Sequence, residues 1–205
     1  MNFLYVMDPM CSWCWAFAPT MKHLQQQYPD IPVEYLMGGL APDSDAPMPL
    51  PLQETIQSTW QHISQLTGTS FNHNFWTTCQ PRRSTYPACR AVLAAEALRE
   101  GGTSDMINAI QHAYYLDAKN PSDSLTLSNI AANLGLDEHK FSQLMESESI
   151  EALLQQHLKL SRQVGANGFP SLYLATNQNT LLPISLGYSD WETVERKLKQ
   201  EIMRG

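Results

Sequence analysis

Near its start the chain carries the stretch Phe3-Leu4-Tyr5-Val6-Met7-Asp8-Pro9-Met10-Cys11-Ser12-Trp13-Cys14, which decides the fold. The apolar run Phe3–Met7 predicts a β-strand over residues 2–7, and residues 12–27 predict a helix that closely follows it. Two cysteines three positions apart at such a junction can close a disulfide across the first helical turn. Cys11 then lies at the helix N-terminus, where unpaired N–H groups and the helix dipole favour a thiolate over a thiol. The stretch therefore predicts thiol–disulfide chemistry.

Length and composition narrow the class of protein. The chain has 205 residues, enough for one large domain or for one domain that carries an insertion. A hydrophobic content of 43% supports a buried core, and a net charge of −7 argues against a basic nucleic-acid surface. The sequence has no continuous apolar run of the length that crosses a membrane. We therefore expect neither nucleic acid nor a membrane among its partners.

The first residues bear on the cellular compartment. Met1-Asn2 leads into the first strand without a basic segment or a signal-length apolar segment. We expect a cytoplasmic protein if Met1 is the native start, whereas a periplasmic location would require a leader removed ahead of it. In a reducing cytosol a C-x-x-C pair is more often catalytic or metal-binding than a structural crosslink.

Zinc is the competing use of cysteine pairs. The remaining cysteines, Cys79 and Cys89, lack the close spacing of a second ligand pair, and the six histidines are scattered. We therefore expect no metal site. We expect Cys79 and Cys89 to be inert buried thiols, and the alternative is that they form a second redox pair. Arg82, Arg83 and Arg90 are the cations nearest to them that can bind an anionic group.

The rest of the chain predicts a sheet interrupted by helices. Residues 33–37 follow the first helix as a second strand, residues 171–175 and 181–186 form two more, and a final helix follows. Between them, helical spacing predicts helices over 52–66, 85–100, 103–116, 127–134, 137–144 and 150–164. Residues 41–51 are expected to form a loop, and residues 69–83 are expected to be irregular.

This order is βαβ, then an all-helical block, then ββα. A sheet interrupted in this way favours a helical insertion over a second independent domain. We expect residues 1–50 and 165–205 to form the two parts of one α/β fold, and residues 51–164 to form the insertion. Three caps are predicted: Thr85 and Asp137 at helix starts, and a capping box over Ser189-Asp190-Trp191-Glu192.

Four features give the chain a resemblance to a known family. They are the turn Asp8–Trp15 around the cysteines, Pro19 within the first helix, Gly165-Ala166-Asn167-Gly168-Phe169-Pro170-Ser171, and Ser84–Arg90. Together they resemble the DsbA-like branch of the thioredoxin superfamily, in particular its FrnE-type and predicted protein-disulfide-isomerase group. The resemblance covers nearly the whole chain and implies a thioredoxin fold with a helical insertion.

The resemblance also implies roles for particular residues. Cys11 is expected to be the nucleophile and Cys14 the resolving thiol. Pro170 is expected to follow a cis peptide bond, so that the backbone of Phe169 can pair with an extended substrate. Ser12 and Trp13, between the cysteines, are expected to tune the redox potential and to contact substrate.

One position departs from the family pattern. The family carries a buried acidic residue six positions before the first cysteine, and Tyr5 stands there in this chain. The proton acceptor for the second cysteine is therefore missing or relocated. Asp8, Glu34 and water are the alternatives that the sequence leaves open.

These observations predict a thiol–disulfide oxidoreductase or isomerase that acts on protein or small-molecule disulfides. No cofactor is expected, although glutathione or a partner protein must recycle the site as reductant or oxidant. Two rival functions remain. One is a glutathione-dependent isomerase or transferase of the kappa or 2-hydroxychromene-2-carboxylate isomerase type, which usually has serine at the first cysteine. The other is a non-catalytic adaptor with a DsbA-like fold.

Overall fold

The computed structural model describes residues 1–177 and 180–203, and these fall into two compact units. The sheet unit comprises residues 1–38 and 157–205, and the helical unit comprises residues 39–156. The sequence analysis placed these boundaries after residues 50 and 164. In the structure the second boundary falls inside a helix, which begins in the helical unit and ends in the sheet unit.

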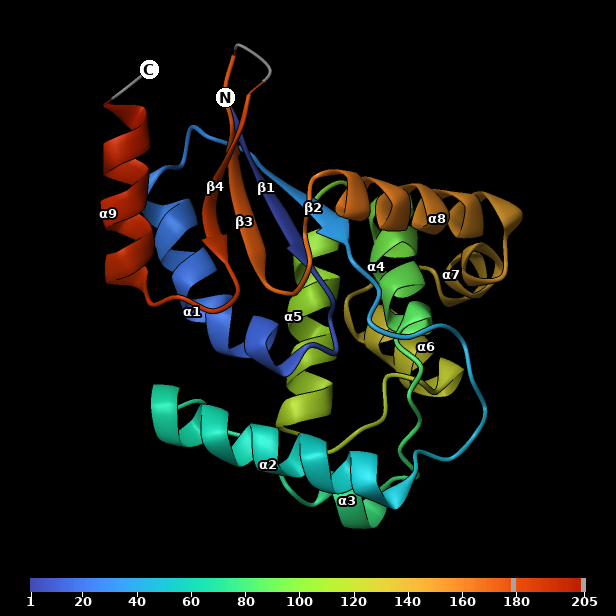
Figure 1. The fold of residues 1–205 in the computed structure, drawn as a ribbon. Helices are drawn as coiled ribbons and strands as arrows, with labels where there is room; N and C mark the ends of the chain where they lie inside the picture. Colours follow the sequence, from blue (N-terminus) through green and yellow to red (C-terminus); the bar gives the residue numbers. More distant parts are fainter. Residues whose placement is uncertain (178–179, 204–205) are drawn as a thin grey trace. The chain divides into compact units, whose positions relative to one another are not determined.

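The sheet unit is built on a four-stranded sheet with the order β2-β1-β3-β4 (Figure 1). Its strands are β1 (Asn2–Met7), β2 (Val33–Met37), β3 (Ser171–Ala175) and β4 (Leu181–Leu186). β1 pairs in parallel with β2 and antiparallel with β3, and β3 pairs antiparallel with β4. This confirms the predicted α/β thioredoxin fold, with βαβ and ββα parts separated by helices.

Strand direction brings three loops to one end of the sheet. In the parallel pair Met7 lies opposite Met37, so β1 and β2 end together. In the antiparallel pair Val6 lies opposite Ser171, so the end of β1 meets the start of β3. The residues that follow β1, follow β2 and precede β3 are therefore neighbours in space, although more than a hundred residues separate the first from the last.

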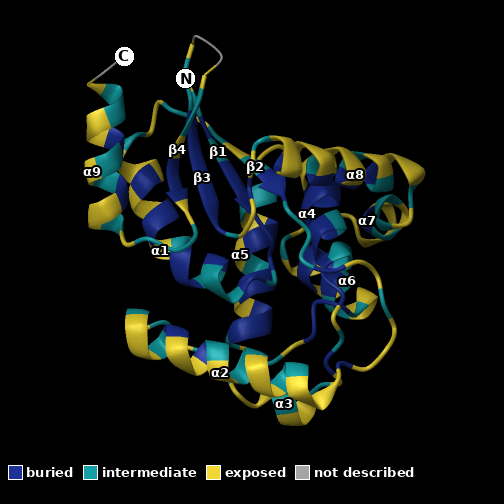
Figure 2. Ribbon diagram, in the orientation of Figure 1, coloured by how far each residue is buried: buried dark blue, intermediate teal, exposed yellow. Residues whose placement is uncertain are grey.

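The two faces of the sheet bury different side chains, because neighbouring residues of a strand point to opposite faces. On one face Val6 packs with Leu36, Ala166 and Tyr173. On the other, the Tyr5 ring lies 5.8 Å from the Phe17 ring of helix α1 (Ser12–Gln27). Figure 2 shows the resulting buried strands, drawn dark blue.

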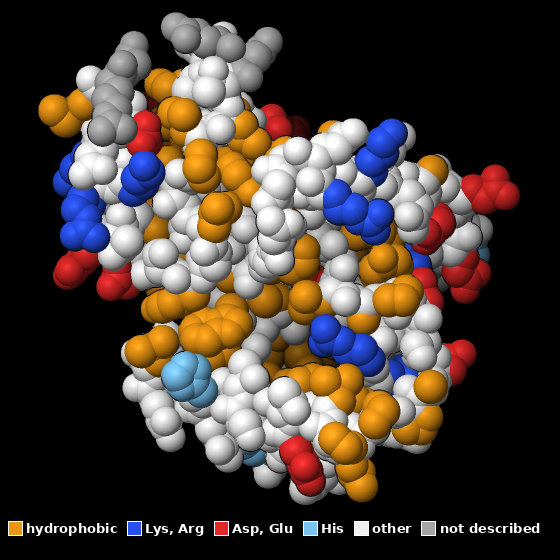
Figure 3. Space-filling view, in the orientation of Figure 1, with side chains coloured by type: hydrophobic (Ala, Val, Ile, Leu, Met, Phe, Trp, Pro, Cys, Tyr) orange, Lys and Arg blue, Asp and Glu red, His pale blue; other side chains and the backbone are white. Residues whose placement is uncertain are grey.

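Helix α9 (Trp191–Ile202) lies beside α1 in the sheet unit, where the Trp191 and His23 rings stack 5.7 Å apart. It buries Val194 and Leu198 on its inner face. Its outer face carries charged side chains, including the Lys199–Glu195 ion pair one turn apart, and Figure 3 shows Lys and Arg gathered over this helix. The helix is therefore held by a narrow apolar stripe.

The helical unit is built from α2 (Leu50–Thr67), α3 (Phe75–Thr78), α4 (Tyr86–Leu98), α5 (Gly102–Tyr115), α6 (Ser124–Asn133), α7 (Glu138–Met145) and the start of α8 (Glu148–Gln163). Trp60 of α2 is fully buried and lies at the centre of an aromatic cluster. Its ring lies 5.0 Å from those of Phe71 and Trp76 and 5.4 Å from that of Tyr115. In the part of the chain that the structure describes, no helix has the length and apolar character needed to span a membrane.

Three local predictions need correction. The short helix α3 lies within residues 69–83, which were expected to be irregular. Thr85 is at the N-cap position of α4 but does not cap it, because its hydroxyl accepts a hydrogen bond from the Ala41 N–H instead (3.1 Å). The N-cap of α9 is Asp190 rather than Ser189, and its carboxylate accepts from the Thr193 N–H (2.9 Å).

The predicted cap at Asp137 is confirmed, since its carboxylate accepts from the Lys140 N–H at the start of α7. The carboxylates of Asp137 and Asp190 thus satisfy an N–H group in the first turn of the helix that each begins.

Candidate functional site

Cys11 lies at the junction between the first loop and α1, in the sheet unit. Its backbone is extended, with φ −81° and ψ 116°, and its carbonyl accepts the first helical hydrogen bond, from the Trp15 N–H (3.0 Å). Its own N–H donates to the Asp8 carbonyl (3.0 Å), and the Asp8 carboxylate accepts from the Met10 N–H (2.7 Å). Asp8 therefore fixes the turn that presents the Cys11 thiol to the loop end of the sheet.

Cys14 lies one helical turn further on and is only 1% exposed. Burial, its hydrogen bond with Cys11 and the nearby negative charge of Cys11 together raise the pKa of Cys14 well above its usual value. The Asp8 backbone opposes this shift by a hydrogen bond to Cys14 that favours the thiolate. Cys14 is therefore held as a thiol at neutral pH. Both cysteines are free thiols in this structure.

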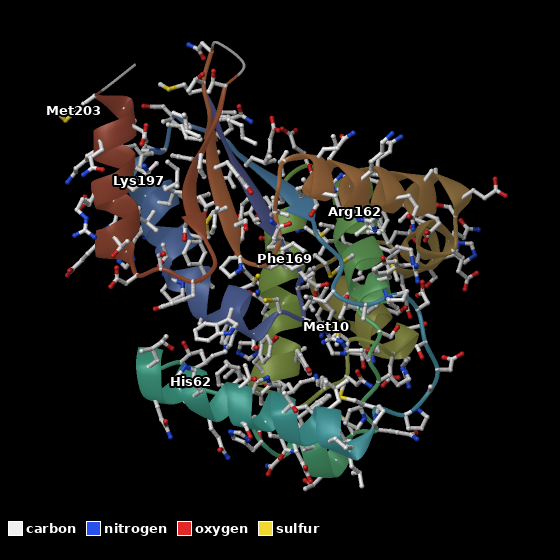
Figure 4. The ribbon with its side chains drawn as sticks, viewed as in Figure 1. Met10, His62, Arg162, Phe169, Lys197 and Met203 are labelled. Atoms are coloured by element: carbon white, nitrogen blue, oxygen red, sulfur yellow. The ribbon has the colours of Figure 1, made fainter. Side chains whose placement is uncertain are left out.

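The loop before β3 faces Cys11 from the other side. The Cys11 thiol donates to the Phe169 carbonyl at 3.6 Å, and the peptide bond between Phe169 and Pro170 is cis. The Pro170 carbonyl accepts from the Gly187 N–H (2.8 Å), which ties this loop to the segment after β4. Figure 4 labels Phe169 and Met10, which come from the two loops that meet here.

The third loop, after β2, contributes Gly38. A Cβ atom built there would lie 2.0 Å from the Phe169 Cζ and 2.1 Å from its Cε1. The Phe169 ring therefore lies against the bare Gly38 backbone, in space that any other residue would fill. Next to it, the Met37 N–H donates to Nδ1 of His157 on α8 (3.2 Å). No motif in the sequence assigned Gly38 to the site.

The two residues between the cysteines are half-buried on the first turn of α1. The Trp13 ring lies 5.5 Å from the ring of Tyr188, in the segment between β4 and α9, and Phe17 contacts the same tyrosine at 6.4 Å. Tyr188 thus helps to set the position of Trp13. No feature of the sequence pointed to it, because it lies far along the chain from the cysteines.

Tyr5 is the other site residue whose contact the sequence did not reveal. Its side chain forms a hydrogen bond with Cys14 from the central strand. The sequence marked this position as a departure from the family pattern but did not say what the tyrosine touches.

Cys79 and Cys89 belong to the helical unit. The Cys79 thiol donates to the Ala118 carbonyl (3.0 Å), and burial raises the pKa of Cys79. Cys89 is fully buried. Among the described residues, no three His, Cys, Asp or Glu side chains gather as a metal site requires.

Two of the three arginines near these cysteines, Arg82 and Arg90, have carboxylate partners. Arg82 pairs with Asp123, and Arg90 pairs with Asp43 and with Glu151 (3.0 Å for the latter). Because Arg90 links the loop after residue 40 to α8, its charge is balanced within the helical unit. We assign Arg82 and Arg90 to structure rather than to anion binding.

Comparison with known proteins places this geometry in context. A model of the DSBA-like thioredoxin domain matches residues 4–199. A provisionally assigned protein disulfide isomerase of Nitrosomonas europaea has a similar structure, with a TM-score of 0.88 and 26% identity over 99% of this chain and 98% of that one. The cytosolic disulfide reductase DsbM of Pseudomonas aeruginosa with GSH is also similar, with a TM-score of 0.78 and 25% identity over 99% of this chain and all of that one.

A curated relative has a different description. The ClpXP adapter protein SpxH of Bacillus subtilis is 25% identical over 193 residues, which is 91% of this chain and 64% of that protein. The chain thus spans less than two thirds of the length of this relative.

Proposed function

Because the chain belongs to the DsbA-like thioredoxin-domain family, we propose that it is a thiol–disulfide oxidoreductase or isomerase acting through Cys11 and Cys14. The observation that carries the proposal is the arrangement of two free thiols in which Cys11 meets the Phe169 carbonyl at 3.6 Å and Cys14 is buried behind it. The family supplies the fold and general chemistry, and the substrates are proteins or small molecules with disulfides.

The two thiols have different environments, so one acts as the attacking thiol and the other as the resolving thiol. Cys11, at the helix N-terminus, attacks a substrate disulfide as the thiolate and forms a mixed disulfide, releasing one substrate sulfur. Cys14 then attacks the Cys11 sulfur, so that the Cys11–Cys14 bond forms and the second substrate sulfur leaves. Two electrons pass to the substrate in total. Burial of Cys14 keeps it protonated until this second step.

Substrate is bound beside Cys11, at the end of the sheet where the loops meet. The Phe169 carbonyl, which accepts from the Cys11 thiol in this structure, is free to pair with an extended substrate segment once that thiol has reacted. Ser12 and the ring of Trp13 border the same thiol from the first turn of α1. Pro170 fixes the loop between this carbonyl and β3.

We favour glutathione as the reductant or co-substrate that recycles the Cys11–Cys14 pair. We also favour a cytoplasmic location, and we expect the protein to need no resident cofactor. The support comes from DsbM, which is described as a cytosolic disulfide reductase and has a structure with GSH. A partner protein that supplies or removes electrons would serve the same cycle. The glutathione-dependent isomerase alternative is disfavoured because this chain retains a cysteine at position 11.

The test is the redox equilibrium of the Cys11–Cys14 pair in glutathione buffers of graded ratio, with Cys11→Ser as the control. We expect a reversible two-electron transition that the variant lacks. A potential near that of thioredoxin, about −270 mV, supports a reductase, and one near that of DsbA, about −120 mV, supports an oxidase or isomerase. Failure to form the disulfide at any ratio would contradict the proposal.

The match to SpxH favours one second candidate, an adapter that binds a partner protein through this fold. An adapter needs a binding surface and no thiol exchange. Binding of a partner, once isolated, should then survive Cys11→Ser, whereas oxidoreductase activity should be lost. Loss of both functions in this variant would argue against a separate adapter role.

A further inference from the structure

Tyr5 lies at the centre of the sheet. On β1 it is paired with Tyr35 of β2 on one side and with Leu172 of β3 on the other, and it is 3% exposed. The next residue, Val6, packs on the opposite face with Leu36. The Tyr5 side chain therefore points away from that cluster, toward helix α1.

The contacts of Tyr5 on that face lead to the second thiol. Its ring lies 5.8 Å from the ring of Phe17, which is three residues after Cys14 and so on the same side of α1. The Tyr5 side chain also hydrogen-bonds with Cys14, which is 1% exposed. A phenolic hydroxyl and a reacting sulfur thus meet in a space from which water is largely excluded.

The charges in this space determine the direction of the hydrogen bond. Burial first, and then the negative charge of the Cys14 and Cys11 thiolates, raise the pKa of Tyr5 well above its usual value. The hydroxyl therefore keeps its proton and can only donate to a Cys14 thiolate. A donor matters in the mixed disulfide, where Cys11 carries no charge, because burial still disfavours the Cys14 thiolate and the charge of Asp8 acts in the same direction.

We propose that Tyr5 is a catalytic residue of the resolving step, in which its O–H donates to the Cys14 sulfur as that sulfur becomes a thiolate and attacks Cys11. This inference rests on the proposed function. In the step the Cys11–Cys14 bond forms and the bond from Cys11 to the substrate sulfur breaks. The proton that Cys14 gives up ends on the departing substrate thiolate, and the Tyr5 proton stays on its oxygen throughout. Tyr5 acts through a charge-assisted hydrogen bond and not as a base.

The experiment compares Tyr5→Phe with Tyr35→Phe. Both changes remove one hydroxyl and keep the ring. The Tyr35 ring lies 5.8 Å from that of Tyr5, but its hydroxyl accepts from the Gln25 amide (3.3 Å), on the far side from the thiols. Tyr35→Phe therefore controls for the loss of a hydroxyl at a neighbouring strand position, and thermal melting of both variants verifies folding.

Reduced protein is mixed with oxidised glutathione, quenched with acid at successive times and analysed by mass spectrometry. This separates attack by Cys11, seen as the glutathione adduct, from resolution, seen as loss of the adduct with formation of the internal disulfide. For Tyr5→Phe we expect unchanged adduct formation and resolution about tenfold slower, a factor equal to ~1.4 kcal/mol. The pH profile of resolution should move to higher pH, because the Cys14 thiolate has lost a donor. Tyr35→Phe should match the unchanged protein in both steps.

Two results would overturn the inference while leaving the proposed function intact. One is a resolution rate in Tyr5→Phe equal to that of the unchanged protein. The other is equal slowing in both variants without a pH shift, which would indicate a packing effect. If the unchanged protein forms neither the adduct nor the internal disulfide, the proposed function itself fails.

Discussion

At the scale of single residues, the site depends on a side chain that is absent. Gly38 leaves room for the Phe169 ring, and the carbonyl of the same phenylalanine meets the Cys11 thiol. The ring and the carbonyl belong to one residue, so the room that Gly38 leaves for the ring favours the backbone position in which the carbonyl meets the thiol. Gly38 is thus a positioning residue for Cys11, although it touches neither thiol in the contacts described.

Adding a methyl group at Gly38 tests whether the contact with the Phe169 ring affects Cys11. Because an added Cβ would lie 2.0 Å from the Phe169 ring, Gly38→Ala must displace the ring. We expect the rate of disulfide reduction to fall by roughly three- to tenfold, the equivalent of ~0.6–1.4 kcal/mol, with a small change in melting temperature because the ring end can rotate. Insulin reduction and thermal melting measure the two effects.

The matched control is a double-mutant cycle with Phe169→Ala. In that background the ring is gone, and Gly38→Ala should have little further effect on the rate. Additive losses in the cycle would show that Gly38 acts by a route other than Phe169.

At the scale of elements, α8 holds the end of β2 through one histidine. The Met37 N–H is buried and donates to Nδ1 of His157, which must be unprotonated to accept it. Burial lowers the pKa of His157 below its usual 6.5. As the pH falls, His157 is therefore protonated in the unfolded chain before it is protonated in the folded protein, and acid favours unfolding.

The lowered pKa of His157 in the folded state predicts how the stability of the protein depends on pH. The contribution of His157 should be fully present above about pH 6.5 and should be lost as the pH falls below that value toward the folded-state pKa. At pH 7.5, His157→Leu should lower the unfolding free energy by roughly 1–3 kcal/mol, because the Met37 N–H loses its acceptor. Urea unfolding at several pH values measures both effects.

The informative control is His157→Asn, whose amide oxygen can accept the same hydrogen bond without titrating. It should lose less stability at pH 7.5 than His157→Leu and should be less sensitive to acid than the unchanged protein. Equal acid sensitivity in the unchanged protein and in His157→Asn would assign the effect to other groups.

At the scale of the whole molecule, the net charge of −7 sets which small disulfides approach Cys11 most readily. A negative field repels anions and attracts cations over about 10 Å at 0.1 M salt. The initial rate with oxidised glutathione, an anion, should rise a few-fold between ~10 mM and ~150 mM salt. The rate with cystamine, a cation, should fall over the same range.

Stopped-flow measurement of both rates over this salt series provides the test, and 2-hydroxyethyl disulfide serves as the uncharged control. A parallel response of the anion and the cation to salt would show that the net charge does not govern approach to Cys11.

The sequence by itself determined the order of elements and the place of the two cysteines among them. Cys11 and Cys14 lie within a few residues of the strand and helix that position them, so local spacing was sufficient to predict a thiol pair at this junction. The apolar periodicity also predicted the strands and most of the helices, since burial of one face is encoded locally. Capping was predicted less well, because Thr85 found a distant partner in Ala41 that sequence spacing cannot reveal.

The tertiary structure alone decided which distant residues surround the thiols. Gly38 reaches Phe169 because parallel and antiparallel pairing of β1 brings three loop ends together, and Tyr188 reaches Trp13 from the segment after β4. Phe169 itself was expected near Cys11 from the family resemblance. The contact of Tyr5 with Cys14 was decided in the same way, since side-chain alternation on a central strand turns Tyr5 toward α1. Strand pairing is a long-range choice that minimises unpaired backbone groups across the whole sheet, and no short stretch of sequence contains it.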